Sequence, residues 1–148
     1  MTPHIQRIKH RPSEGQYGDC YRTAIACLLD MEPEEVPHFY GKDMKEQDIL
    51  ASEWLLSQGY NIFTISFSGE LTLDDLLYSV AFNNPNIYYL VTAASSVTNH
   101  VFIAFNDKIV HDPSGRNETP SGPCDDNYYW IQVLVPLQIC ALAANPIS

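Results

Sequence analysis

Residues 16–29 read QYGDCYRTAIACLL, a polar loop followed by a run of mostly apolar residues. The apolar side chains recur at the spacing of one buried helix face, which predicts a helix over residues 20–30. Asp19 occupies the position of an N-cap, and Cys20 is then the first helical residue. The positive end of the helix is expected to favour the reactive thiolate of Cys20. A lone cysteine on such a helix is more often a small core residue, so a catalytic interpretation needs partners elsewhere.

Length and composition bound the class of protein. The 148 residues suffice for one domain with a substantial core, and 45% hydrophobic with 18% charged residues is typical of a globular chain. Eight Lys and Arg stand against eighteen Asp and Glu, which gives a net charge of −10. Because non-specific nucleic-acid binding rests on neutralising phosphates with basic side chains, we expect no nucleic-acid partner.

The sequence also bears on the compartment and on cofactors. No apolar run approaches the roughly eighteen residues of a membrane span, and residues 1–15 lack the apolar core of a signal peptide. The four cysteines, Cys20, Cys27, Cys124 and Cys140, are irregularly spaced, which predicts reduced thiols in a cytoplasmic protein. No Cys-x-x-Cys or His-x-x-x-His pair occurs, so we expect no metal site and no cofactor.

The order of the predicted elements indicates an α+β fold. Helices are expected over residues 20–30, 45–57 and 72–81, the last capped by Thr72, and a short helical turn lies within the connector 31–39. Strands are expected over residues 60–67, 87–93, 100–105, 108–112 and 128–135. Residues 1–14 are expected to form an irregular, solvated arm, and residues 15–148 a single domain with helices packed on an antiparallel sheet. The polar loop 116–127 is long enough to lie over a cleft.

A possible general base follows from the predicted hairpin. His100 opens one strand, Asn106-Asp107 forms the turn, and the second strand ends at Asp112. The start of the first strand therefore lies beside the end of the second, which brings a carboxylate to His100. Alone, His100 is more often a structural hydrogen-bonding residue and Asp112 a turn residue before proline. Together with Cys20 they supply the nucleophile, base and orienting acid of a catalytic triad.

Further polar residues extend this interpretation. Gln16 lies four residues before Cys20, and its amide is a candidate oxyanion donor; an exposed glutamine is an equally good interpretation. Asp19 suits the helix cap better, because a carboxylate would repel a developing oxyanion. His111 and His38 are rival bases, but His111 should point away from the face that Asp112 occupies. Cys27 lies two helical turns after Cys20 and should be buried and inert, whereas Cys124 in its polar loop should be labelled slowly.

These motifs resemble the papain-like cysteine peptidases, and within them the C39-like branch that processes bacteriocins. The resemblance rests on Gln16-x-x-Asp19-Cys20 entering a helix, on His100 opening a strand, and on Asp112-Pro113-x-Gly115. The segment GDCYRTAIA with Glu35-Val36-Pro37-His38-Phe39 is also similar to small uncharacterised proteins of bacteria and phages. One departure is Tyr21, where the C39 pattern has glycine, which removes the basis for expecting that branch's preference for glycine in the substrate.

The resemblance implies a papain-like fold and carries the triad to Cys20, His100 and Asp112, with Gln16 as oxyanion donor. It implies a cysteine hydrolase that cleaves a peptide or isopeptide bond in the cytoplasm of a bacterial cell or a phage-infected host, with a peptide or protein as its substrate. Acyl transfer is an alternative, since transglutaminases and arylamine acetyltransferases use a similar Cys, His, Asp order. Cell-wall amidases that begin with Asp-Cys usually continue Ser-Gly, which is absent here. A phage-type binding or inhibitor protein that has lost the chemistry is the third alternative.

Overall fold

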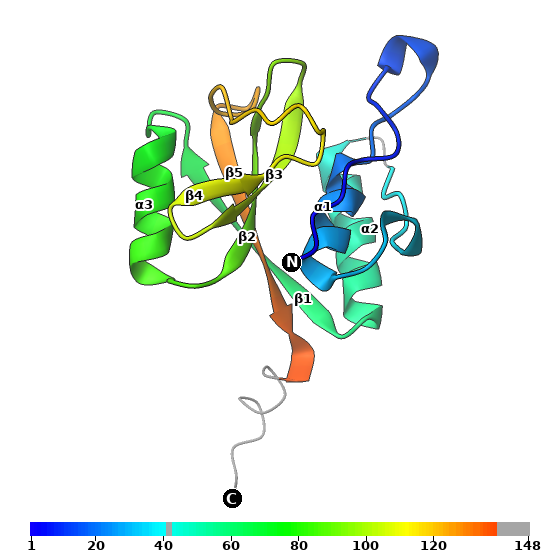
Figure 1. Ribbon diagram of the computed structural model, residues 1–148, viewed down its shortest axis with the longest axis horizontal. Helices are drawn as coiled ribbons and strands as arrows, with labels where there is room; N and C mark the ends of the chain where they lie inside the picture. Colours follow the sequence, from blue (N-terminus) through cyan, green and yellow to red (C-terminus); the bar gives the residue numbers. More distant parts are fainter. Residues whose placement is uncertain (41–42, 139–148) are drawn as a thin grey trace, which may run out of the picture.

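The computed structural model describes residues 1–40 and 43–138, and it shows an α+β domain in which three α-helices surround a five-stranded antiparallel sheet (Figure 1). The helices are α1 (Cys20–Leu29), α2 (Met44–Ser57) and α3 (Leu73–Asn83), with short 3-10 turns η1 (Pro12–Glu14) and η2 (Pro33–Glu35). The strands are β1 (Tyr60–Ser68), β2 (Tyr88–Ala94), β3 (Asn99–Phe105), β4 (Lys108–His111) and β5 (Tyr128–Pro136). The predicted helices and strands are confirmed, with boundaries moved by one or two residues.

Local sequence explains where the helices begin and end. The Thr72 side chain accepts a hydrogen bond from the backbone N–H of Asp75, as predicted for the start of α3. Asp43 caps α2 in the same way through the N–H of Glu46. α1 ends at Asp30, which adopts the left-handed conformation with φ 55°, a common way to end a helix.

The strand order in the sheet is β1-β5-β2-β3-β4, so the last strand lies in its centre. β5 pairs with β1 along its whole length and with β2 through Leu90, Val91 and Thr92. β3 joins β2 and β4 to complete the sheet, and every pairing is antiparallel. Strands distant in sequence are therefore neighbours in the sheet. The two ends of the loop between β4 and β5 come close to the start of β3, through the His100–Asp112 and Asn99–Asp125 hydrogen bonds.

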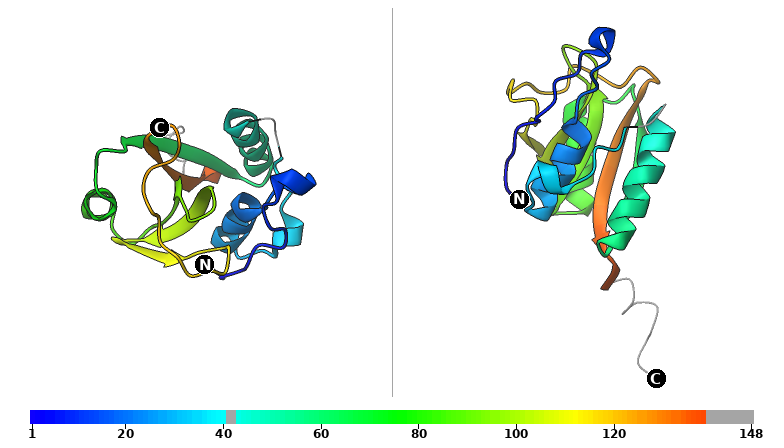
Figure 2. Two further views of the ribbon diagram at one scale, coloured as in Figure 1. Left: turned by 90° about the horizontal axis from the view of Figure 1, so that it is seen from above. Right: turned by 90° about the vertical axis from the view of Figure 1, so that its right-hand side faces the viewer.

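Helices cover both faces of the sheet, as the left view of Figure 2 shows. α1 and α2 pack on the face formed by Leu90, Val101 and Ile103. α3 packs on the opposite face, against residues that include Val91 and Phe102. Each large apolar side chain buried in this way stabilises the fold by about 1.5–3 kcal/mol. The N-terminal helices thus pack on the sheet as expected, while α3 forms a third layer behind it.

The N-terminal arm is tied to the body of the domain. The N–H of Ile8 donates to Asp19 Oδ1 at 2.8 Å, and Arg7 Nε donates to Glu34 Oε1 at 2.7 Å. The arm lies beside the start of α1 in Figure 1. Instead of being only a solvated lead-in, it therefore contributes one wall beside Cys20. None of the helices within the described residues is long and apolar enough to cross a membrane.

Candidate active site

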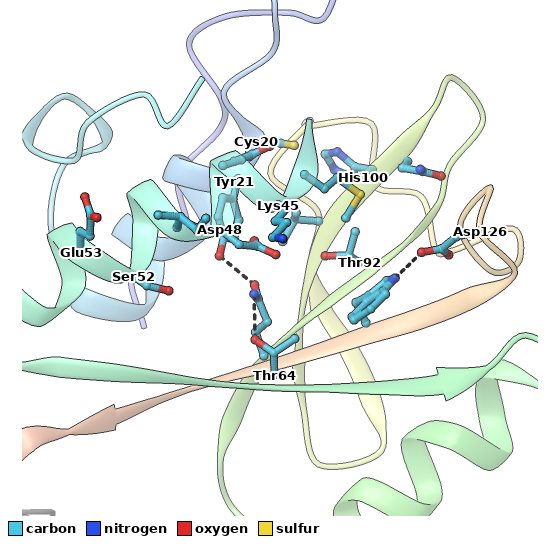
Figure 3. A pocket seen from close by; sticks show the side chains of 17 residues that line it. Cys20, Tyr21, Lys45, Asp48, Ser52, Glu53, Thr64, Thr92, His100 and Asp126 are labelled. Atoms are coloured by element: carbon cyan, nitrogen blue, oxygen red, sulfur yellow. Dashed lines mark hydrogen bonds between the residues drawn. The ribbon is translucent and has the colours of Figure 1, made fainter. Parts of the chain in front are cut away.

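Cys20 is the first residue of α1, and the helix presents it to the start of β3. The N-terminal arm packs closely against the loop that leads into α1. Gly18 in this loop permits the close approach, because a Cβ at that position would lie 3.0 Å from Cβ of His10. The Cys20 side chain is half-buried, and the backbone N–H of Val101 acts on its sulfur. Cys20 and His100 line the same two cavities, and Figure 3 shows the sulfur and the imidazole ring pointing toward one another.

His100 and Asp112 form a buried pair. His100 Nε2 lies 2.7 Å from Asp112 Oδ1, and the two residues are 5% and 4% exposed. The ring of Phe102 meets the imidazole edge-on, with centroids 4.8 Å apart, and limits its rotation. The expected partnership between these two residues is therefore present in the structure.

A β-bulge explains why Asp112 reaches His100. The pairing of β3 with β4 shifts by one residue between Ile103 and Ala104. Continued along β4, the shifted register sets Asp112 opposite Phe102, so both side chains point to the same face of the sheet. His100 is two residues before Phe102 and points to that face as well. Without the extra residue, Asp112 would point to the other face.

The charge states of the pair follow from their surroundings. Burial alone would raise the pKa of Asp112, but hydrogen bonds from the Ser114 hydroxyl and from the N–H groups of Ser114 and Glu118 hold that pKa below its ordinary value. Burial lowers the pKa of His100 below 6.5, although the Asp112 carboxylate acts in the opposite direction. A carboxylate can only accept, so His100 carries its proton on Nε2. The unprotonated Nδ1 of the neutral ring is then the available base.

The surroundings of Cys20 favour the thiol over the thiolate. Burial raises the pKa of Cys20 to about 11, and the negative charge of Asp19 contributes in the same direction. The N–H groups of Val101 and Tyr21 lower the pKa, but they do not outweigh burial. The helix end therefore acts in the expected direction, but burial has the larger effect on the pKa of Cys20. Cys20 and His100 thus bring a thiol and a neutral imidazole to the same two cavities.

The larger of the two cavities has a volume of about 660 Å³ and lies between α1, α2 and the sheet (Figure 3). A chain of hydrogen bonds crosses its floor: the Tyr21 hydroxyl donates to Gln132 Oε1 at 2.9 Å, and Gln132 Nε2 donates to Thr64 Oγ1 at 3.2 Å. Trp130 lines another wall and donates from its indole N–H to Asp126 at 2.8 Å. The cavity is therefore a preformed site of the size that an amino-acid side chain or small ligand requires.

The smaller cavity, about 330 Å³, adjoins the larger one and shares Cys20 and His100 with it. The N-terminal arm supplies Lys9, His10 and Arg11 to its lining, and the loop after β4 supplies Arg116. The two ends of the predicted 116–127 loop thus reach both cavities, since Asp126 lines the larger one. These positions of its ends are compatible with the expectation that the loop lies over a cleft.

Gln16 does not join the site. Its side-chain amide donates to the carbonyl oxygen of Lys9 at 2.8 Å, and Gln16 lines neither cavity. Two other amide residues, Gln47 of α2 and Asn99 of β3, line both cavities together with Cys20 and His100. Asn99 uses its side-chain oxygen to accept from the N–H of Asp125 at 3.3 Å. The prediction of Gln16 as an oxyanion donor is therefore not supported by its contacts.

Asp19 does not cap α1 with its side chain, which corrects the sequence-based prediction. The carboxylate is 1% exposed and accepts from the N–H of Ile8 and from Arg22 Nε, the latter at 2.9 Å. Arg22 also donates to the Val36 carbonyl oxygen at 3.3 Å. Both carboxylate oxygens are thus committed, and Asp19 fixes the arm and the connector around the start of α1.

Within the described residues, the remaining histidines and cysteines that the sequence singled out form contacts away from the candidate site. His111 donates to the His4 carbonyl oxygen and His38 to that of Tyr17, so neither contacts Cys20. Cys27 is fully buried, as expected, and burial raises the pKa of its thiol. Cys124 is buried as well, and burial raises the pKa of its thiol to about 12. Cys140 lies outside the described residues.

The residues of the site that sequence reasoning missed include His10, Gln47 and Asn99. Only Asn99, adjacent to His100, carried a local signal.

Within residues 1–40 and 43–138, no group of three or more His, Cys, Asp or Glu side chains forms an arrangement that could hold a metal ion. Comparison of the chain with protein-family models, curated proteins and solved structures finds no match.

Proposed function

We propose that this protein is a cysteine hydrolase that cleaves a peptide or isopeptide bond with Cys20 as nucleophile, His100 as general base and Asp112 as orienting acid. The observation that carries the proposal is the buried hydrogen bond between His100 and Asp112, which leaves Nδ1 of His100 free beside a cysteine at the rim of a 660 Å³ cavity. A core histidine or a structural cysteine would need no such cavity.

The chemistry balances with these three side chains. His100 Nδ1 takes the thiol proton while sulfur attacks the substrate carbonyl carbon, and Asp112 stabilises the imidazolium that forms. His100 then gives that proton to the leaving amine as the carbon–nitrogen bond breaks, which produces a thioester on Cys20. Water attacks the thioester with His100 again as base, and the thiol and a carboxylic acid are released. Because the resting thiol is neutral, the first proton transfer accompanies the attack.

The developing oxyanion needs donors at the start of α1. The N–H of Cys20 is at the first helical position, where no acceptor exists within the helix. We propose Gln47 as the second donor, in place of Gln16, because it lines both cavities where they meet at Cys20 and His100.

The resemblance of the Asp19-Cys20, His100 and Asp112-Pro113 motifs to papain-like peptidases supports a papain-like fold of the C39-like branch as part of this proposal. The arrangement of a cysteine-bearing helix against an antiparallel sheet is compatible with it. A bacterial or phage-infected cytoplasm, with a peptide or protein substrate, suits the free thiols of Cys20, Cys27 and Cys124.

The test is to trap the thioester. Wild-type protein is incubated with activated peptide esters, and intact mass spectrometry is expected to show one acyl group, which vanishes in Cys20→Ala and persists in the His111→Ala control. Adding an amine distinguishes hydrolysis from acyl transfer: a transferase yields amide rather than acid. If no acyl group forms while the protein still binds a partner after Cys20→Ala, the protein is a binding or inhibitor protein.

A further inference from the structure

The two cavities meet at the candidate catalytic pair. Cys20, Gln47, Asn99 and His100 line both of them. A substrate whose reacting carbonyl lies at Cys20 therefore extends into the larger cavity on one side of the scissile bond and into the smaller cavity on the other. The chemical character of each cavity then selects what each half of the substrate carries.

The charge of the lining differs between the cavities. Lys9, Arg11 and Arg116 line the smaller one, and no carboxylate stands among its described lining residues. Only eight of the 148 residues are Lys or Arg, against eighteen acidic residues, so three cations in one 330 Å³ cavity oppose the sign of the chain as a whole. The larger cavity is the reverse, with three carboxylates and the single cation Lys45.

The three cations differ in whether they form ion pairs with neighbouring carboxylates. Arg116 donates to Glu118 Oε1 at 2.8 Å, and Arg11 lies 3.7 Å from Glu14 in an exposed pair. Within the described residues, the Lys9 ammonium forms no ion pair. Lys9 is thus the cation most available to a ligand.

His10 adds a neutral donor to the same cavity. Its Nδ1 accepts from the N–H of Gly18 at 3.2 Å, which leaves Nε2 with a proton to donate. Donors of these two kinds in one cavity are suited to a carboxylate, which accepts from several donors at once.

We infer that the part of the substrate in the smaller cavity carries a carboxylate close to the scissile bond, either an acidic side chain or a terminal carboxylate. The inference rests on the proposed function for the position of the scissile bond, and on the cavity itself for the charge. A positive cavity beside the nucleophile raises the local concentration of anions and favours them by an amount that falls with ionic strength.

One experiment tests the charge preference without any peptide. Cys20 is alkylated by iodoacetate, an anion, and by iodoacetamide, its neutral analogue, and the ratio of the two rate constants is measured at low salt. We expect Lys9→Gln to lower this ratio, Lys9→Glu to lower it further, by roughly threefold to tenfold, and added salt to diminish the difference. Lys108→Glu, the same charge change at an exposed site lining neither cavity, should leave the ratio unchanged. An equal ratio in wild type and Lys9→Glu overturns the inference.

A second experiment uses matched peptides that carry Glu or Gln beside the scissile bond, each with a free or an amidated C-terminus. We expect kcat/KM to favour the peptide with a carboxylate by about threefold to tenfold, and the preference to fall in Lys9→Glu. The Glu and free-terminus arms distinguish a side chain from a terminal carboxylate. If wild type cleaves all four peptides equally, the inference is wrong while the proposed function stands. If it cleaves none and forms no acyl group, the proposed function fails, and the alkylation ratio still decides the anion preference.

Discussion

The imidazole of His100 and the carboxylate of Asp112 are joined by a 2.7 Å hydrogen bond in which Nε2 is the donor, and both groups are almost completely buried. The bond fixes the tautomer, so that Nδ1 is the basic nitrogen. We predict that Asp112→Asn lowers kcat by about 10²- to 10⁴-fold, because a carboxamide can hold the ring with its proton on the wrong nitrogen and cannot stabilise an imidazolium.

The matched control for this variant is His111→Ala on the neighbouring residue. His111 donates to the His4 carbonyl oxygen, so its loss should leave kcat near wild type. Steady-state kinetics with a chromogenic peptide ester measures both. A full rate in Asp112→Asn would show that Asp112 only orders the turn that contains Ser114.

The raised pKa of Cys20 predicts how its alkylation depends on pH. Because the pKa lies at about 11, the rate of iodoacetamide labelling should increase about tenfold per pH unit from neutral pH upward. Cys27 and Cys124 are buried and should react only after denaturation. Peptide mapping of labelled protein measures all three rates. Fast labelling of Cys20 that is independent of pH near pH 6 would instead indicate a preformed thiolate and imidazolium pair.

The buried Asp19–Arg22 ion pair should matter more for stability than an N-cap would. Removing one partner leaves an uncompensated charge, so Asp19→Ala is expected to lower the free energy of unfolding by about 3–5 kcal/mol. Glu14→Ala, which removes the exposed Arg11–Glu14 pair, should cost at most about 1 kcal/mol. Urea denaturation of the two variants measures the difference. Equal effects would mean that water reaches Asp19.

The lowered pKa of His100 makes stability depend on pH in a defined direction. Below pH 6.5 the unfolded chain binds a proton at this residue before the folded protein does, so the free energy of unfolding falls as pH decreases through and below 6.5. At still lower pH, protonation of Asp112, whose pKa is also lowered, adds to the loss. Melting temperatures from pH 8 to 5 should show this slope in wild type and a shallower one in His100→Asn. Identical slopes would assign the acid sensitivity to other groups.

Variants of Gln47 and Gln16 distinguish which of these two residues is the oxyanion donor. Gln47→Ala should lower kcat roughly a hundredfold with little change in the melting temperature, since one donor to the transition state is lost. Gln16→Ala should leave kcat near wild type, because its amide is bonded to the Lys9 carbonyl oxygen and Gln16 lies outside both cavities. The reverse result would mean that the N-terminal arm rearranges when substrate binds.

Local sequence was sufficient to predict the elements of this fold. The apolar period after Cys20, the Thr72 cap and the Asn106-Asp107 turn each act over a few residues, and the helices and strands they predict are present. The pairing of His100 with Asp112 was predictable for the same reason, because a tight hairpin brings the ends of its two strands together.

Tertiary structure alone decided the rest. Whether Asp112 or His111 shares a face with His100 depends on a one-residue bulge, which a pattern of alternating side chains does not reveal. The insertion of β5 between β1 and β2 forms the floor of the larger cavity, and the packing of the arm directs Gln16 to Lys9 and Asp19 to Arg22. The helix position of Cys20 predicted a low pKa, but burial raised it, because desolvation depends on every segment packed around the sulfur.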